Sequence, residues 1–297
     1  GDSRYGRRIQ SIYAEVLAAH YGDQYAGLLE HAQDAPLGEK GSEYALWHRR
    51  PDLKVDGDMA LPLRSEWFPG WQVAVMRGGT ASSHTAFYHH AAPFGVHRHY
   101  DTLGLIYLAH GREMATDRGY IWDDPRNAWT KSTRAHNIVT VDGENQMGNT
   151  DPSTLELFGA GAGVEVVQSS AKTYEQCDLY RRTNVLVQIP GDRTYAVDLF
   201  RVHGGSRHQY NFHCNRSLIS TGSLTLTDSD EEMAWLEGIR EGRPDGPVTA
   251  TWQDEDVRLD MRLLSPVDRV LVADAPGWRT DSGEELNAPP VQQILAE

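Results

Sequence analysis

The chain has 297 residues, of which 39% are apolar and 9% aromatic. It is long enough for about two domains with a substantial core, and too apolar to be disordered. No run approaches the roughly 18 apolar residues of a membrane span. Its 28 Lys and Arg stand against 42 Asp and Glu, a formal net charge of −14. This balance argues against a general nucleic-acid binder, because such a protein needs a basic surface to meet phosphates.

The sequence is rich in ring side chains with polar tips, with 13 His, 8 Trp and 13 Tyr. Such residues line clefts for carbohydrates and other polar ligands, although most of them in any protein pack in or near the core. Cys177 and Cys214 are the only cysteines, which excludes a disulfide-rich scaffold. Their spacing does not show whether they pair.

The N-terminal part, residues 7–35, has the periodicity of amphipathic helices. Gly22-Asp23 interrupts the pattern, so Asp23 is expected to cap a second, shorter helix. Residues 35–63 indicate a connecting segment with one more helical turn near residues 44–47. These helices are too few to bury their apolar stripe against one another. The stripe must therefore pack on a sheet or on something outside this sequence. The stripe consists of Ile9, Ile12, Tyr13, Val16 and Leu17.

From Trp67 onward the pattern changes to the alternation typical of strands. Residues 184–190 and 194–202 are rich in β-branched side chains and flank a Pro-Gly-Asp turn, which predicts a hairpin. Residues 257–263 alternate most clearly. Large antiparallel sheets with one packed face are therefore expected. The acidic run 228–232 is expected to be a solvated loop.

The predicted fold class is mainly β: a large antiparallel β-sandwich preceded by a few helices. We expect a helical segment and linker over residues 1–62 and the β-sandwich domain over residues 63–297.

The densest group of chemically active residues lies in segment 94–101. If this segment is a strand, His97, His99 and Asp101 share one face. Imidazoles and carboxylates that converge in this way suit a Zn²⁺ site or proton transfer. In the alternative interpretation, one histidine faces the core or the metal and the others lie on the surface.

Two later residues could complete a metal site. Asp117 follows His99 by 18 residues, and His136 follows Asp117 by 19, which suits residues brought together by neighbouring strands. A His/Asp/His set is one that Zn²⁺ accepts, with a water or a fourth group completing the tetrahedron. The alternatives are that Asp117 caps a turn and that His136 is an ordinary half-buried histidine.

The order of these motifs resembles the C-terminal half of the heparinase II/III-like polysaccharide lyases. Segments 198–205 and 208–213 fit the same pattern, and the resemblance covers about residues 65–215. Residues 216–297 carry no motif that we can place in the family. The motifs are His97-Arg98-His99, Asp117-Arg118-Gly119-Tyr120, Ala135-His136-Asn137-Ile138-Val139 and Val141-Asp142-Gly143.

The resemblance implies an incomplete (α/α) toroid followed by antiparallel sheets, with the active cleft between them. It implies cleavage of uronic-acid-containing acidic glycans by β-elimination. His97 would point into the cleft as a catalytic residue, and His99, Asp117 and His136 would hold a structural zinc ion. That metal would keep the wall of the cleft in shape.

The resemblance also implies that the catalytic Tyr and its accompanying Asn or His belong to the toroid, of which residues 1–50 resemble only the last helices. We therefore expect this chain to be the C-terminal portion of a longer lyase. Its partners would be an acidic polysaccharide or oligosaccharide and the N-terminal toroid fragment or chain of the same protein. The sequence begins at Gly1 without Met, and Tyr5 is a weak candidate for the cleft. Lyases of this kind imply a periplasmic or secreted location.

Substrate contacts are expected from Tyr120 and Trp122, which could stack on a sugar ring, and from Arg134, which could pair with a substrate carboxylate. Sheet packing and a surface position are the respective alternatives. Another possible function is a non-catalytic carbohydrate-binding β-sandwich with a structural zinc. A cupin-type metalloenzyme is disfavoured, because Leu103 and Gly104 stand where that motif expects Glu.

Overall fold

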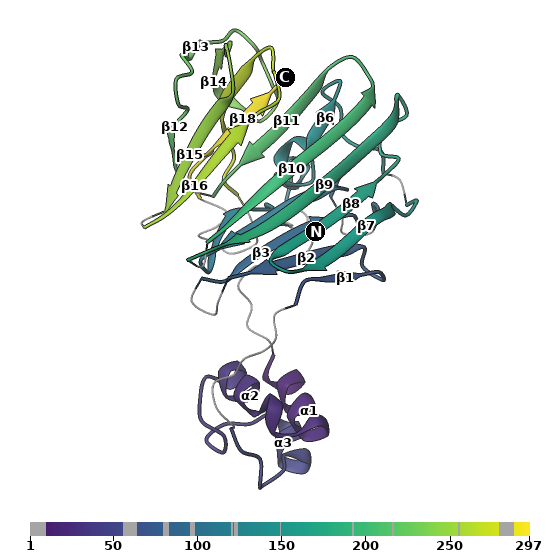
Figure 1. Cartoon of the computed structure of the whole chain (residues 1–297), viewed down its shortest axis with the longest axis vertical. Coiled ribbons are helices and arrows are strands. Elements are labelled where there is room, and N and C mark those ends of the chain that lie inside the picture. The colour runs from purple at the N-terminus through teal and green to yellow at the C-terminus, as the bar shows by residue number, and fades with distance from the viewer. Residues whose placement is uncertain are drawn as a thin grey trace. The chain divides into compact units, whose positions relative to one another are not determined.

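The computed structural model describes eleven ranges of the chain, which divides into two compact units, residues 4–63 and residues 64–297 (Figure 1). Each unit is described by itself. Within the described ranges, no helix has the length and hydropathy needed to span a membrane. The described residues are 10–55, 64–79, 83–95, 99–119, 121, 124–148, 150–191, 193–215, 217–254, 256–278 and 288–297.

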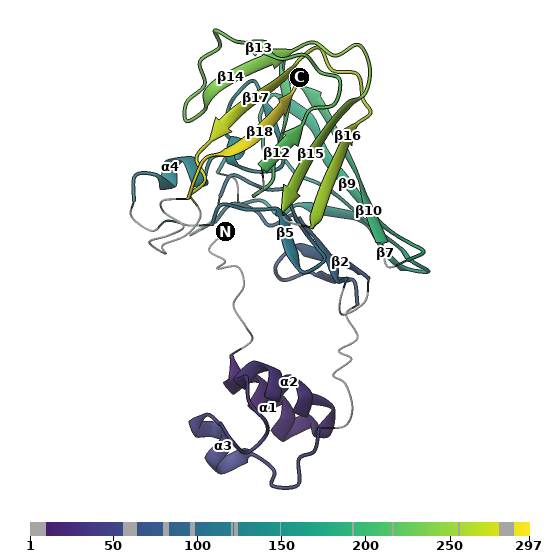
Figure 2. The ribbon, with the colours of Figure 1, turned by 90° about the vertical axis from the view of Figure 1, so that its left-hand side faces the viewer.

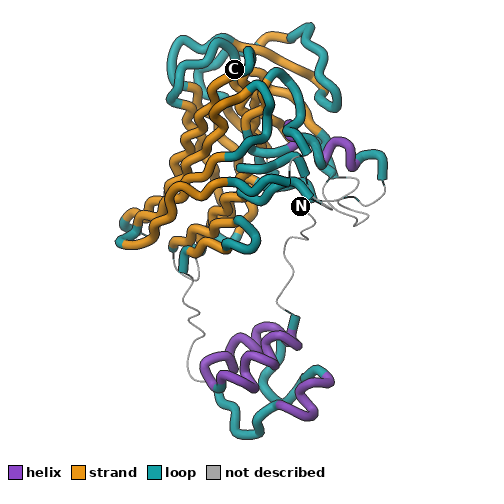
Figure 3. Tube along the Cα trace, turned by 90° about the vertical axis from the view of Figure 1, so that its right-hand side faces the viewer, coloured by secondary structure: helices purple, strands orange, loops and turns teal. Residues whose placement is uncertain are grey.

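The first unit is helical, as Figure 3 shows in purple. Its helices pack around a small cluster of Ala14, Ala18, Leu28 and Leu29. They are α1 (Ser11–Tyr21), the single 3-10 turn η1 (Asp23–Tyr25), α2 (Ala26–Gln33) and α3 (Glu43–His48).

The buried face of α1 differs from the predicted stripe. Ile12 and Tyr13 are 42% and 60% exposed, whereas Glu15 is buried. Glu15 forms an ion pair with Arg49, whose guanidinium also donates to the carbonyl of Lys40 at 2.7 Å. Because this buried ion pair fixes the inward face of α1, the helix turns its larger apolar side chains outward.

The second unit is built of antiparallel strands, and the prediction of a mainly β fold is confirmed. One five-stranded sheet is a simple meander in chain order, and one four-stranded sheet has the order β10-β9-β8-β7. Their strands are β1 (Glu66–Phe68), β2 (Val73–Gly78), β3 (Thr85–His90), β4 (Gly104–Ala109), β5 (Arg112–Ala115), β7 (Thr154–Gly161), β8 (Val164–Ser170), β9 (Cys177–Ile189) and β10 (Arg193–Gly204).

The other two sheets hold most of the C-terminal strands (Figure 2). Their orders are β13-β14-β17-β18-β11-β6 and β12-β15-β16. A short helix α4 (Asn127–Thr130) and a 3-10 turn η2 (Thr133–Ala135) precede β6. The strands are β6 (Val139–Val141), β11 (His208–His213), β12 (Ser217–Ser220), β13 (Thr227–Asp228), β14 (Glu237–Gly242), β15 (Val248–Asp254), β16 (Val257–Leu263), β17 (Val270–Ala275) and β18 (Val291–Ala296).

Two strand predictions are confirmed in detail. β9 and β10 pair as a long hairpin that begins at Ile189 and Arg193, on either side of the predicted turn. β16 alternates between half-buried and exposed side chains, with Leu259 and Met261 packed on the core. That core is continuous and takes buried side chains from all four sheets. Cys177 and Cys214 are both free thiols.

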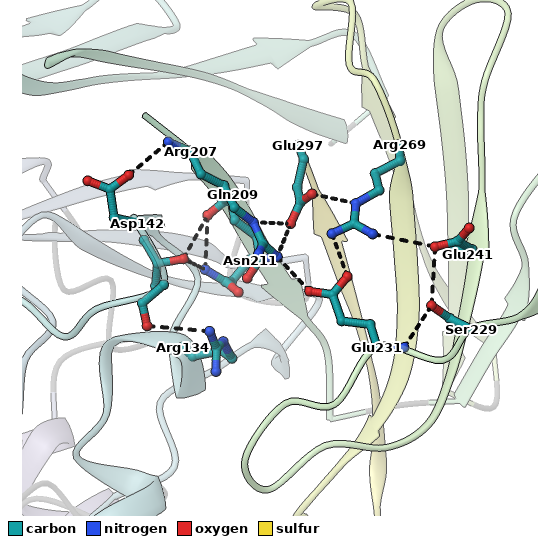
Figure 4. Close-up of polar contacts among 12 residues, drawn as sticks. Arg134, Asp142, Arg207, Gln209, Asn211, Ser229, Glu231, Glu241, Arg269 and Glu297 are labelled. Carbon is teal, nitrogen blue, oxygen red and sulfur yellow. Dashed lines mark hydrogen bonds and ion pairs between the residues drawn. The ribbon is translucent and has the colours of Figure 1, made fainter. Parts of the chain in front are cut away.

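The acidic run 228–232 is not simply a solvated loop. The carboxylate of Glu231 forms ion pairs with Arg207 at 2.8 Å and with Arg269 (Figure 4). Both arginines also bind the side chain of Glu297. The run is therefore fastened to its neighbours at Glu231, because two guanidinium groups far away in the sequence converge on it.

The inner face of β9 carries buried polar side chains between its apolar ones. Asn184 is fully buried, and its amide oxygen lies 2.7 Å from Nδ1 of the equally buried His89 on β3. Burial lowers the pKa of His89 from its usual 6.5 to about 4, although the bond to Asn184 opposes this shift. His89 is therefore neutral in the folded protein at pH values where it is protonated in the unfolded chain.

This shift predicts a pH-dependent stability. Because the pKa of His89 is lower in the folded state, its contribution to stability is present above pH 6.5 and is lost as the pH falls towards 4. The loss approaches about 3 kcal/mol at 1.36 kcal/mol per pKa unit. Urea unfolding of the metal-free chain at pH 7 and pH 4.5 measures it. In His89→Gln the difference between the two pH values should shrink by most of that amount; an unchanged difference would contradict the assignment.

Candidate metal centre

Four metal-binding side chains from three separate segments meet inside the second unit. His99 and Asp101 lie just before β4, Asp117 lies just after β5, and His136 follows η2. Each is at most 4% exposed. Their ligand atoms all lie within 4.8 Å of one another, so the group could bind a metal ion.

Three of the ligand atoms form a nearly equilateral triangle. Nδ1 of His99 lies 3.0 Å from Nε2 of His136 and 3.5 Å from Oδ2 of Asp117. Nε2 of His136 lies 3.3 Å from the same oxygen. Ligands that sit about 2.0–2.1 Å from a tetrahedral Zn²⁺ are roughly 3.3 Å apart. The triangle therefore has the size of one face of a zinc coordination tetrahedron.

The orientation of His136 is fixed from outside the cluster. Its Nδ1 lies 2.8 Å from the carbonyl oxygen of Ser132, to which it can only donate a proton. This bond leaves the lone pair of Nε2 directed at the cluster, as a metal ligand requires. Nε2 of His99 is buried and has no hydrogen-bond partner among the described residues.

The carboxylates supply the charge that a cation would balance. Burial by itself would raise the pKa of Asp117, but His99 and His136 hold it well below its usual range. The pKa of Asp101 is likewise lowered, against the effect of burial, chiefly by His90. Burial lowers the pKa of His99 and so favours the neutral imidazole that a metal binds, whereas Asp117 raises the pKa of His136 against the effect of burial.

Asp117 combines the two roles that its sequence position allowed. Its Oδ1 accepts a 2.5 Å hydrogen bond from the backbone N–H of Gly119, which is the turn-capping contact. Its Oδ2 faces His99 and His136. Each oxygen of the carboxylate thus has its own function, and the cap fixes the direction of the second one.

The route by which the cluster forms differs in part from the expected one: the paired strands β4 and β5 do bring His99 and Asp117 together. Residues 99–101 are not in a strand, and Tyr100 is instead held by a 3.0 Å backbone bond to Lys131. Asp117 and His136 also lie in connections beside strands. Asp101 was placed beside His99 by the alternation argument but left out of the expected ligand set, although the structure brings it into the cluster.

A third histidine, beside the two in the cluster, had no signal of its own in the sequence. His213, at the end of β11, is buried, and burial holds its pKa well below the usual value. Its backbone N–H donates to the side chain of Asn137, the residue after His136. Only its position in the motif-bearing segment 208–213 could have drawn attention to it.

Among the other expected site residues, His97, Tyr120, Trp122 and Tyr5 lie outside the described residues. Arg134 is half-buried against a turn, where its Nη2 lies 3.5 Å from the carbonyl oxygen of Gly143 (Figure 4). Burial, and then the nearby Arg207, lower the pKa of its guanidinium.

Comparison with known proteins identifies the family. The family described as "Heparinase II/III-like, C-terminal" matches residues 60–268, well over half of the chain. The chain belongs to the heparinase II/III-like C-terminal family. The family recognised from the order of the histidine and aspartate motifs is thus confirmed, and the matched range contains all four residues of the candidate metal centre.

Two solved lyase structures share the fold. The chain is similar to the heparan sulfate lyase HepC from Pedobacter heparinus, with a TM-score of 0.58, 13% identity and coverage of 96% of this chain and 38% of that one. It is also similar to a heparinase III, the BT4657 gene product, with a TM-score of 0.51, 16% identity and coverage of 96% and 40%. The chain therefore spans about two fifths of these heparinase structures. No curated protein matches it significantly in sequence.

Proposed function

We propose that this chain is the C-terminal portion of a polysaccharide lyase that cleaves uronic-acid-containing acidic glycans by β-elimination. The observation that carries the proposal is the buried His99–Asp117–His136 triangle within the segment that matches the family. The shared fold with heparan sulfate lyase HepC supports the same class of reaction.

The chemistry requires proton transfer at a weakly acidic carbon. Elimination removes the proton at C5 of a uronate, and the developing negative charge must be stabilised beside it. We assign His97 to the active cleft that the family resemblance implies, as a proton-transfer or charge-stabilising residue. Tyr120 and Trp122 would stack on sugar rings, and Arg134 would pair with a substrate carboxylate. These assignments rest on the family resemblance.

The metal is proposed to be a structural zinc ion. His99, Asp101, Asp117 and His136 offer four protein donors, which is the closed ligand set of structural sites; catalytic sites keep one position for water. Bound there, the ion would neutralise the two buried carboxylates. It would also tie together the three segments on which the ligands lie.

The remaining parts of the proposal concern the whole enzyme. The catalytic Tyr and its Asn or His partner would come from an N-terminal toroid portion of the same protein, consistent with a chain that spans 38% of HepC. A polymeric glycan is an extracellular substrate, so we place the enzyme in the periplasm or outside the cell.

A lyase assay tests the proposal. The chain, alone and together with the toroid portion, is incubated with alginate, heparan sulfate, hyaluronan and ulvan, and unsaturated uronate is followed by its ultraviolet absorbance. We expect product only with the toroid portion present. If the complete protein binds one of these glycans without forming product, the alternative of a non-catalytic carbohydrate-binding β-sandwich replaces the lyase.

A further inference from the structure

The inner face of β9 presents a row of buried polar side chains to the loops of the metal centre. Tyr180, Arg182 and Asn184 alternate along the strand, and each is at most 2% exposed. The next inward residue, Leu186, packs in the main core, as inward residues of a sandwich usually do. The ring of Tyr180 also packs in an apolar cluster with Leu103 and Ile138, but the polar groups at these three inward positions need a role besides apolar packing.

Arg182 is at the centre of this row and is fully buried. Its Nε and Nη2 donate to the two carboxylate oxygens of Asp198 on β10, at 2.8 and 2.7 Å. Its guanidinium also lies 5.1 Å from the ring centroid of Phe200. Asp198 accepts further bonds from Asn184 and Tyr210, both at 2.8 Å. The bidentate pairing of Arg182 with Asp198 fixes the plane of the guanidinium.

The remaining donor, Nη1, reaches two backbone carbonyls at once. It lies 2.6 Å from the oxygen of Leu103 and 2.7 Å from the oxygen of Asn137. Leu103 follows the candidate ligand Asp101 by two residues, and Asn137 directly follows the candidate ligand His136. One guanidinium thus bonds to both of the segments that carry these ligands.

The turn at Leu103 needs such a support. Leu103 has a φ of +70°, a backbone conformation that costs a residue with a branched side chain of order 1–3 kcal/mol. Its N–H donates to the backbone carbonyl of His90 at 2.7 Å, while its own carbonyl accepts the bond from Arg182. The strained turn is therefore held by hydrogen bonds at both the N–H and the carbonyl of Leu103.

Other buried side chains nearby also bond to backbone carbonyls of the two ligand segments. The hydroxyl of Tyr180 donates to the carbonyl of Val139 at 2.6 Å, three residues beyond His136. The amide of Gln146 donates to the carbonyl of Thr102 at 2.9 Å, beside Asp101. The two ligand segments are thus fixed at several adjacent points, and Arg182 joins them directly through the carbonyls of Leu103 and Asn137.

We propose that Arg182, oriented by Asp198, is a positioning residue for the metal centre. It bonds the turn after Asp101 to the segment after His136, so that both ligands converge on one point. The inference rests on the proposed metal site and adds a residue outside its ligand set. Partners that orient metal ligands from outside the coordination sphere typically contribute 10–100-fold to metal affinity.

The test is the zinc affinity of the full chain, measured by competition with a chelator at a temperature well below unfolding. We expect Arg182→Met to weaken zinc binding about 10–100-fold. The matched control is Val167→Ala, which removes fully buried apolar volume on β8, the neighbouring strand. It should lower the unfolding temperature but change the zinc affinity less than about threefold.

A spectroscopic readout separates positioning from stability. Co²⁺ bound to the unchanged chain should give the intense visible bands of a tetrahedral site, and Arg182→Met should weaken or shift them. Should Arg182→Met fail to fold, Asp198→Asn, which keeps the shape but loses the charge, is expected to show the same effects more weakly.

The outcomes are distinct. If the folded variants keep the zinc affinity and the cobalt spectrum of the unchanged chain, Arg182 is only a structural residue. That result would overturn the inference while leaving the metal centre intact. If the unchanged chain itself binds neither Zn²⁺ nor Co²⁺, the metal centre fails, and the positioning role fails with it.

Discussion

Removal of the metal is expected to lower the unfolding temperature of the second unit by about 10 °C. The chelated protein retains two buried carboxylates, Asp101 and Asp117, without the cation that would balance them. A ligand present at a thousandfold excess over its Kd stabilises the folded state by about 4 kcal/mol. For a unit of this size, each kcal/mol corresponds to roughly 2–4 °C. Scanning calorimetry with and without a chelator, followed by added Zn²⁺, measures the shift.

Two variants, one at a candidate metal ligand and one at the surface, test whether this shift comes from the metal. Asp117→Asn should abolish the response to chelator, because the amide is a poor zinc ligand and leaves the triangle incomplete. Asp178→Asn changes an exposed aspartate and should keep the full response. A purified protein with no near-stoichiometric zinc, and no thermal response to chelation or added Zn²⁺, would show that the cluster is not a metal site.

Replacement of His97 by Ala is expected to lower turnover of the complete enzyme by about 10²–10⁴-fold, the contribution typical of a positioned proton-transfer group. The substitution should leave zinc content and unfolding temperature unchanged, since the family resemblance directs this side chain towards the substrate. Initial rates on the glycan found active in the lyase assay give the effect on kcat and KM.

The control for His97 is His203→Ala, which removes an exposed imidazole whose charged partner is Asp178. Its turnover should match that of the unchanged enzyme. If His97→Ala loses zinc and unfolds at a lower temperature in proportion to its loss of activity, His97 supports the structure and is not catalytic.

Much of the fold could be predicted because strand alternation is a local signal. The hairpin of β9 and β10 and the half-buried strand β16 were readable from a few neighbouring residues. The inward face of α1 was not readable, because it depends on the ion pair between Glu15 and Arg49, which are 34 residues apart. An apolar stripe carries no information about such a partner.

The candidate site was predictable to a similar extent. His99, Asp117 and His136 were found through residue type and motif order, and the structure brings these three together. The expectation that His99 and Asp101 share one strand face was wrong, because both lie in a connecting segment, but His99 and Asp117 do flank the neighbouring paired strands β4 and β5. Arg182 could not be found in this way. Its carbonyl partners Leu103 and Asn137 lie 79 and 45 residues away, and a backbone carbonyl has no residue signature.

The position of Arg182 in the sequence has a consequence for biosynthesis. All four candidate ligands are translated before it, and Asn137 precedes it by 45 residues. At about 5–20 residues per second, the nascent chain carries its ligands for about 2–9 s before the residue that joins their segments is made. On the proposed role of Arg182, tight metal capture would be delayed until β9 has been synthesised and paired. The ion would then bind a partly built domain, because strands β10 to β18 follow Arg182 in the sequence, and would not be the nucleus around which translation builds it.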